Sequence, residues 1–320
     1  SVLGFTGAVC AMAMIKLEWG VIPSLLATLV VGLAIGAWHG FWVAYRKVPA
    51  FIVSLASMLA FRGLIIGLTG GQTQGLEMAP ERAANAFKLI GQGYIPTLAA
   101  AGEGQLHDTS LYLTLLAILL FVFSGLRKRR ARRKFGFPVL PAHLEAARLF
   151  FLSAIIGVFA MIMVIYLGIP WSVVLLLLLA VLFSFVAGDT TFGRHLYAIG
   201  GNPDAARLSG IAVPRNTFAL FMVMGVMTAV AGIVYTSRLN AATTSAGQNA
   251  ELDAIAAAVI GGTSLMGGEG TVFGAIVGAL VMASLDNGMS LMNLDITFQY
   301  VIKGLILLLA VWVDMAQRKK

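Results

Sequence analysis

Charged residues and cysteine are both scarce in this chain of 320 residues. Asp, Glu, Lys and Arg make up only 11% of the sequence, whereas soluble domains carry about 25%. The single cysteine, Cys10, excludes an intrachain disulfide and argues against Cys-cluster metal sites or CxxC redox chemistry. Hydrophobic residues reach 59% and the mean hydropathy is +0.91, so we expect an integral membrane protein.

Nucleotide-binding and hydrolytic motifs are missing as well. No lysine is followed by Ser or Thr, so the P-loop GxxxxGK[ST] is absent and the chain cannot be an ATPase of that type. The patterns HExxH and GxSxG do not occur, and the four histidines fall on separate segments. An intramembrane enzyme is therefore the poorer hypothesis, and we expect no catalytic residue, metal or cofactor in the chain itself.

Long apolar blocks dominate what is present. They run for about 17 to 25 residues, the length of a helix that crosses the ~30 Å hydrocarbon core, rather than the ten or so of a barrel strand. We predict an all-α, polytopic transmembrane bundle that forms one domain over 1–320, with about nine spans plus one short or broken helix. The predicted segments are 1–15, 21–44, 51–68, 110–125, 149–167, 171–186, 217–235, 252–262, 271–285 and 298–313.

Basic residues predict the orientation, because short cytoplasmic loops concentrate Lys and Arg. A cytoplasmic carboxy terminus puts most of the 22 Lys and Arg residues inside. This topology predicts an external loop at 69–108 that carries a short amphipathic helix, a basic cytoplasmic loop at 126–148 and a polar cytoplasmic loop at 192–215. It also requires the short segment 252–262 to change sides.

The run Arg127-Lys-Arg-Arg-Ala-Arg-Arg-Lys134, together with a net charge of +8, raises the alternative of nucleic-acid binding. However, the run follows an apolar segment at once and lacks interleaved aromatic residues. We therefore interpret it as a topogenic segment or a contact with anionic membrane lipid, and we expect no nucleic-acid partner.

Glycines recur at four-residue spacing in three places, a pattern that lets membrane helices approach closely. We predict that these rows pack helices together, either within the chain or between subunits. The rows are Gly32, Gly36 and Gly40; Gly63 and Gly67; and Gly270, Gly274 and Gly278.

Residues 251–270 combine a short apolar helix with five glycines. The helix is too short to cross the bilayer alone. Two interpretations stay open at this point. Irregular backbone can line a translocation pathway, where a cavity or the protein satisfies its polar groups, or the segment can be a simple cytoplasmic turn.

Ionisable and polar residues in or near the spans are further pathway candidates, because a charge within hydrocarbon costs at least ~2.5 kcal/mol. Arg62 and Lys303 lie within predicted spans, where they could serve a pathway or form structural ion pairs and snorkel. The set that could line a route for a polar solute is Arg62, Glu251, Asp253, Ser284, Asp286, Asn287 and Gln299.

The polar segment 192–215 contains a short helix with clear end signals. Asn202 is a good N-cap, Pro203 suits the first helical position, and Asp204 meets the positive end of the helix dipole. Gly210 can stop the helix in the left-handed conformation. So short a helix is marginal in water and must pack against something, either a partner or the protein itself. Its small apolar face would consist of Ala205, Leu208 and Ile211, and Arg207 with Asp204 would offer charge to a partner.

Several of these stretches resemble the permease subunits of bacterial ATP-binding-cassette importers for monosaccharides, of the ribose and xylose type. The likeness covers nearly the whole chain except the 69–108 loop and the region around 127–148. It rests on Asn202-Pro-Asp-Ala-Ala-Arg-Leu-Ser-Gly-Ile211, Glu251-Leu-Asp-Ala-Ile-Ala-Ala-Ala-Val-Ile-Gly-Gly-Thr-Ser264, Ala283-Ser-Leu-Asp-Asn-Gly-Met289, Trp42-Val-Ala-Tyr-Arg-Lys-Val-Pro49 and Met58-Leu-Ala-Phe-Arg-Gly63.

The resemblance implies a homodimeric permease of the bacterial inner membrane, with the 202–210 helix inserted into a separate ATPase subunit that binds ATP and magnesium. It also implies an external sugar-binding protein as a partner. Family permeases carry further amino-terminal spans, so the chain is expected to be truncated there. An ion- or proton-coupled carrier remains an alternative, and the sugar could be xylose, ribose, arabinose or galactose.

Overall fold

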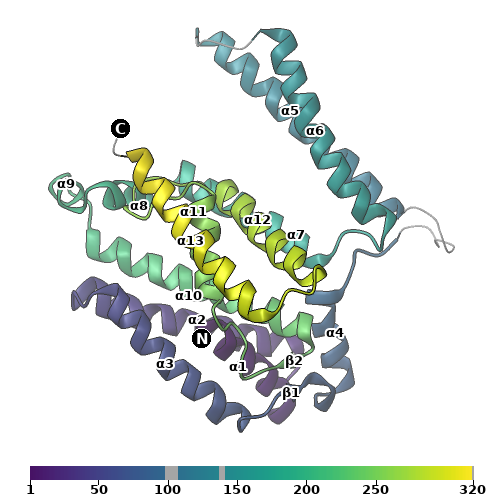
Figure 1. The fold of residues 1–320 in the computed structure, drawn as a ribbon, viewed down its shortest axis with the longest axis vertical. Helices are drawn as coiled ribbons and strands as arrows, with labels where there is room; N and C mark the ends of the chain where they lie inside the picture. Colours follow the sequence, from purple (N-terminus) through teal and green to yellow (C-terminus); the bar gives the residue numbers. More distant parts are fainter. Residues whose placement is uncertain (98–106, 137–140, 319–320) are drawn as a thin grey trace. The chain divides into compact units, whose positions relative to one another are not determined.

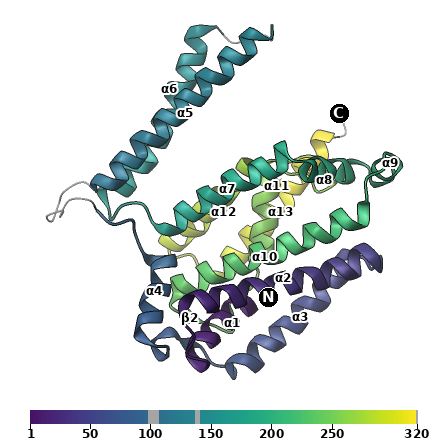
Figure 2. The same ribbon diagram turned by 180° about the vertical axis from the view of Figure 1, so that it is seen from behind.

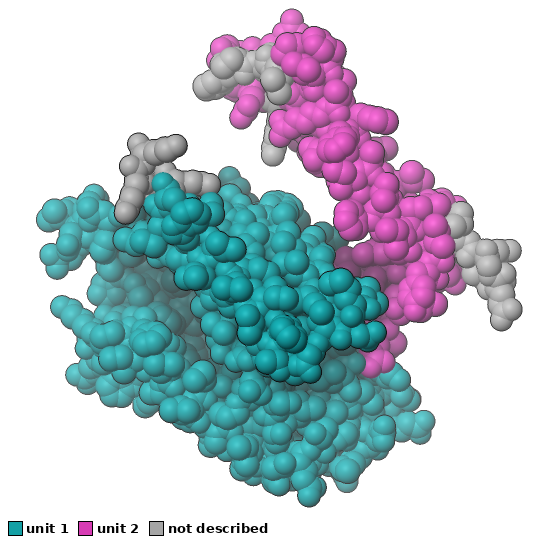
Figure 3. Space-filling view, viewed as in Figure 1, with its two compact units in different colours: residues 1–88, 176–320 teal, residues 89–175 magenta. Residues whose placement is uncertain are grey.

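The computed structural model describes residues 1–97, 107–136 and 141–318. Its contacts divide the chain into two compact units, residues 1–88 with 176–320 and residues 89–175 (Figure 3). Both units are built from helices, which confirms the predicted all-α class. Each unit is described by itself below.

Four helices of the first unit form one packed group (Figures 1 and 2). They are α1 (Val2–Lys16), α2 (Val21–Gly40), α3 (Ala50–Thr69) and α10 (Val213–Leu239). A π-helical turn, η1 (Phe41–Tyr45), extends α2. These helices are apolar on all sides, so hydrophobicity alone does not determine which faces meet. Small residues determine it, because they let the helix backbones approach closely.

The first glycine row lies between α2 and α10. A Cβ atom on Gly32 would lie 2.6 Å from the carbonyl oxygen of Gly225, and one on Gly40 would lie 3.0 Å from that of Phe218. A Cβ atom on Gly36 would collide with the backbone of Phe221. The two helices therefore meet backbone to backbone along this row.

The other two rows differ from the first. Gly274 and Gly278 lie on α12 (Val272–Leu291) and approach the backbone of α11 (Ala250–Ile260), but Gly270 precedes α12 with φ +152° and is not on its packing face. A Cβ atom on Gly63 or Gly67 would meet nothing within 4 Å. These two glycines pack no helix within the described residues, and an intersubunit contact there stays a prediction.

A second group of helices in this unit consists of α11, α12 and α13 (Ile296–Arg318). Helix α11 packs on α12 and α13 through a small core of Ala256, Ala257 and Met282. Helices α7 (Trp171–Asp189), α8 (Thr191–Gly201) and α9 (Pro203–Leu208) precede them in the chain. The segment predicted as a loop at 192–215 is thus mostly helical, because α8, α9 and the start of α10 occupy it.

The segment after α3 carries the amphipathic helix predicted within 69–108, here α4 (Glu81–Gln92). Phe87 of α4 is fully buried, and its carbonyl oxygen accepts a hydrogen bond of 2.6 Å from the hydroxyl of Ser237. A two-residue strand, β1 (Gln74–Gly75), pairs antiparallel with β2 (Ala241–Ala242), and a 3-10 turn, η2 (Leu76–Met78), follows β1. Residues 98–106 of the predicted loop lie outside the described residues.

The second unit is a hairpin of α5 (Asp108–Lys134) and α6 (Ala142–Ile165) (Figure 1). The prediction of a basic loop at 126–148 is wrong for most of its length, since α5 continues to Lys134 and α6 begins at Ala142. Arg, Lys and Ala are strong helix formers, and cations favour the carboxy-terminal end of a helix. Residues 137–140 lie outside the described part.

Eight of the described helices are long and apolar enough to cross a membrane, judged by length and composition. They are α2 with η1, α3, α5, α6, α7, α10, α12 and α13. Helix α1 is apolar but has only 15 residues, and α11 has 11. The prediction of about nine spans and one short helix agrees with this set when α1 is counted among the spans.

Candidate coupling and pathway site

Helix α9 begins and ends where its sequence predicts. The side-chain oxygen of Asn202 accepts hydrogen bonds from the backbone N–H groups of Asp204 at 3.1 Å and Ala205 at 3.0 Å, and Pro203 opens the helix. Gly210 follows with φ +85°, a conformation that costs glycine little and other residues more. These caps fix a helix that would be unstable as an isolated peptide.

The surface of α9 is open. Leu208 is 86% exposed, whereas Ala206 is buried. Arg207 and Asp204 form an ion pair of 3.7 Å, but both side chains are largely exposed, so the pair contributes little to stability. The helix therefore presents one apolar side chain and two charged ones that another protein could contact.

Helix α8 connects α9 to the glycine-rich segment 261–270. The hydroxyl of Tyr197 donates a hydrogen bond of 2.9 Å to the carbonyl oxygen of Gly270. A Cβ atom on Gly200 would lie 2.5 Å from the backbone nitrogen of Gly268, and Gly267 and Gly268 have φ of +91° and +78°. The backbone of Gly200 therefore touches the backbone of this segment, and the Tyr197 side chain adds a hydrogen bond one turn earlier.

At the other end of α11, three charged side chains meet. The Nζ atom of Lys303 on α13 lies 2.8 Å from Oδ2 of Asp286 on α12 and 3.2 Å from Oδ2 of Asp253 on α11. The second carboxylate oxygen of Asp286, Oδ1, is buried and accepts no hydrogen bond from the described residues. This charge cluster joins three helices and confirms ion pairing for Lys303.

The other predicted pathway residues do not join this cluster. Arg62 donates to the carbonyl oxygens of Thr244 and Ala246 at 2.9 and 3.3 Å, so it fixes the segment before α11. The side-chain amide of Gln299 donates to the carbonyl oxygen of Leu294 at 2.9 Å and stabilises the α12–α13 connection. The remaining three candidates are exposed side chains, and none of them is an ion-pair partner of Lys303 among the described residues: Glu251, Ser284 and Asn287.

The connection between α12 and α13 also holds a charged cap. The backbone N–H of Thr297 donates to Oδ1 of Asp295 at 2.8 Å. Hydrogen bonds from the side chain and backbone of Thr297 hold the pKa of Asp295 below its usual value. Across the described ranges, no group of three or more His, Cys, Asp or Glu side chains could hold a metal ion.

Two sets of contacts in the site were not predicted from the sequence. The backbone contact of Gly200 and Gly201 with Gly267 and Gly268 was not predicted, although paired glycines in two polar segments signal a close approach of backbones. The carbonyl partners of Arg62 carry no such signal, because any residue supplies a carbonyl group.

The fold places the chain in the class of multi-pass α-helical membrane proteins. The family model described as "Branched-chain amino acid transport system / permease component" matches residues 1–311. The chain therefore belongs to this family of permease components. Since a permease component is a transport subunit, the family confirms that the chain is not an enzyme.

Relatives give the comparison more detail. The xylose transport system permease protein XylH of Haemophilus influenzae is 44% identical over 320 residues, which is 100% of this chain and 81% of the relative. XylH of Escherichia coli K12 is 47% identical over 321 residues, 100% of this chain and 77% of the relative. The ribose import permease protein RbsC of Haemophilus influenzae is 31% identical over 314 residues, 98% and 74% respectively. No solved structure matches the chain.

Proposed function

We propose that the chain is the membrane-spanning permease subunit of an ATP-driven importer of D-xylose. The observation that carries the proposal is identity of 44 to 47% with xylose permeases over the whole chain, against 31% with a ribose permease. The family description names amino acids, so the family alone does not choose the cargo.

In this proposal, α9 is the element that docks on a separate ATPase subunit, which binds ATP and magnesium. The exposed side chains of Leu208 and Arg207 support that role, because an apolar anchor beside a charge suits a specific protein contact. The residues that form this docking helix are Asn202, Pro203, Asp204, Ala205, Arg207, Leu208 and Gly210.

Movement of α9 would reach the bundle through α8. The backbone contact of Gly200 with Gly268 and the hydrogen bond from Tyr197 join α8 to the segment that leads from α11 to α12. The cluster of Lys303, Asp253 and Asp286 then joins both helices to α13. This succession of contacts supports a rocking, alternating-access mechanism in which α11 and α12 move with the docking helix.

The remaining assignments belong to the same proposal. Two copies of the chain form a homodimer in the bacterial inner membrane, with the sugar route between them and the carboxy terminus in the cytoplasm. An external sugar-binding protein delivers xylose to the opposite side. The predicted pathway residues would shape the sugar route rather than bind sugar directly. Arg62 and Gln299 would do so through their hydrogen bonds to backbone carbonyl oxygens.

The experiment is uptake of radiolabelled xylose by proteoliposomes that hold the permease, its ATPase subunit and loaded binding protein. Arg207→Glu on α9 should abolish uptake and leave membrane insertion intact. Arg215→Glu is the matched control. Arg215 is an exposed base like Arg207, but it lies on α10 and not on α9. We expect the control to retain uptake.

Three outcomes would contradict the proposal. Normal uptake by inserted Arg207→Glu protein would exclude α9 as the coupling element. Uptake that continues without ATP and stops with an ionophore would indicate an ion-coupled carrier. Uptake of ribose, arabinose or galactose in preference to xylose, with the matching binding protein, would correct the cargo.

A further inference from the structure

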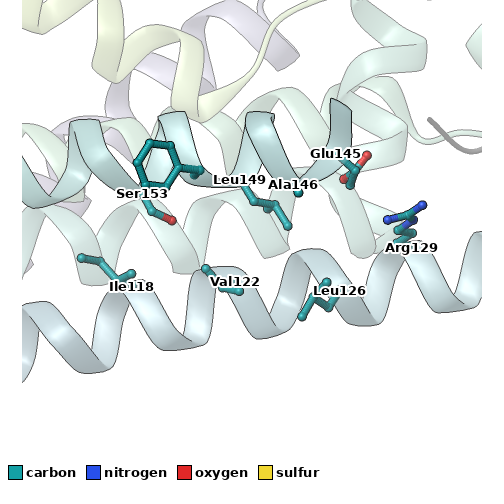
Figure 4. Close-up of a pocket in the computed structure, with 9 residues that line it drawn as sticks. Ile118, Val122, Leu126, Arg129, Glu145, Ala146, Leu149 and Ser153 are labelled. Carbon is teal, nitrogen blue, oxygen red and sulfur yellow. The ribbon is translucent and has the colours of Figure 1, made fainter. Parts of the chain in front are cut away.

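The hairpin of α5 and α6 contains an apolar groove that the transport mechanism does not use. Its volume is about 370 Å³, and both helices line it. Figure 4 shows Ile118 at one end and Arg129 with Glu145 at the other, with Val122, Leu126 and Leu149 between them. The groove thus runs from a mostly apolar end, where the hydroxyl of Ser153 is the one polar group among the residues lining that end, to a charged end.

The length of the groove matches one leaflet of a bilayer. Eleven residues of α5 separate Ile118 from Arg129, which at 1.5 Å per residue is about 16 Å. The hydrocarbon core of a bilayer is about 30 Å thick, so one leaflet contributes about 15 Å. A molecule in this groove would therefore reach from mid-bilayer to the level of the lipid headgroups.

The charge beyond the groove is positive. Arg129 and Arg133 follow Ile118, Val122 and Leu126 on one face of α5, because residues three or four apart lie on the same side of a helix. Arg133 is exposed, and it lies one turn beyond the charged end. Glu145 offsets one of the two positive charges, so the groove end keeps a net positive charge.

We propose that this groove binds an anionic phospholipid, with an acyl chain between α5 and α6 and the phosphate held by Arg133 beside Arg129. A guanidinium group can donate two parallel hydrogen bonds to a phosphate, which gives Arg an advantage in such contacts. The site differs from a general attraction of basic residues to a charged membrane, since it requires the groove and one face of α5. It does not depend on which solute the permease carries.

Native mass spectrometry of the full-length chain with added phosphatidylglycerol or phosphatidylcholine tests the proposal. Arg133→Gln should weaken phosphatidylglycerol binding about fivefold. Arg127→Gln is the matched control, because it removes the same charge from the same helix about 120° away from Arg133. The control should bind phosphatidylglycerol as the unchanged protein does. Ala146→Trp, which fills the groove, should reduce binding without removing a charge.

Several results would overturn the proposal. Equal binding of the two lipids would show that the groove does not select an anionic headgroup. Equal losses in Arg133→Gln and Arg127→Gln would show diffuse attraction instead of a site. Oxidative cross-linking of Val122→Cys between two copies, unaffected by phosphatidylglycerol, would show that a second copy occupies the groove. Circular dichroism of each variant separates loss of the site from loss of the helical fold.

Discussion

Replacement of Lys303 by methionine should destabilise the bundle by leaving two carboxylates without their shared cation. The side-chain oxygens of Asp253 and Asp286 lie 3.2 and 2.8 Å from Nζ of Lys303, so they are at most about 6 Å apart. At that distance and an effective dielectric constant of about 20, two negative charges repel by about 3 kcal/mol, a repulsion that the attraction of Lys303 offsets in the unchanged protein. Since Lys303 is 22% exposed and each carboxylate is 36% exposed, the dry-interior dielectric constant does not apply.

The assay is unfolding of the purified chain in mixed micelles, followed by circular dichroism. We expect Lys303→Met to lower the free energy of unfolding by about 3 kcal/mol. The triple variant Lys303→Met, Asp253→Asn, Asp286→Asn should recover most of that loss, because the repulsion is removed together with the cation. Asp253→Asn alone should cost less than Lys303→Met, since Lys303 keeps Asp286 as its partner.

Two results would refute this reasoning. One is a free energy of unfolding for Lys303→Met that lies within about 1 kcal/mol of that of the unchanged protein. The cluster would then contribute no more to stability than an exposed ion pair does. If the triple variant is no more stable than Lys303→Met, the loss comes from packing of the lysine side chain and not from charge. Xylose uptake by the triple variant would then show separately whether transport needs the charges.

Three further predictions concern backbone contacts and a cap. Gly36→Ala should cost about 1 to 3 kcal/mol in the same unfolding assay because it forces α2 away from α10, whereas Gly63→Ala, which meets open space, should be neutral or slightly stabilising. Gly200→Ala should lower xylose uptake while Gly201→Ala, whose Cβ atom would meet nothing within 4 Å, should not; equal losses would refute the contact. Asn202→Ala should speed hydrogen exchange of the first α9 amides by roughly fivefold, as expected for a cap of about 1 kcal/mol, and unchanged exchange would contradict the cap.

The spans and helix α9 could be predicted from the sequence because their signals are local. A block of apolar residues of bilayer length predicts a crossing helix wherever it packs. The caps of α9 act within a few residues of one another, so Asn202 and Gly210 predict the two ends of the helix without knowledge of the rest of the chain.

The charge cluster could be predicted only in part. Asp253, Asp286 and Lys303 were each recognisable as costly in a membrane, but their meeting depends on how α11, α12 and α13 pack. Glycine spacing likewise could not separate Gly36, which touches α10, from Gly63, which faces no other helix among the described residues. The basic run was misassigned to a loop, because its residues are as suitable for a helix end as for a cytoplasmic connection.

The contact between α8 and the 261–270 segment has a consequence for how this permease can change its sequence. Elsewhere in a bundle, a substitution that alters volume can be absorbed by new rotamers of its neighbours. Gly200 and Gly268 have no rotamers to offer, and a carbon atom added to either would collide with backbone. This contact therefore cannot adjust to a larger residue by a change of side-chain rotamer. A side chain at Gly200 or Gly268 would separate α8 from the 261–270 segment.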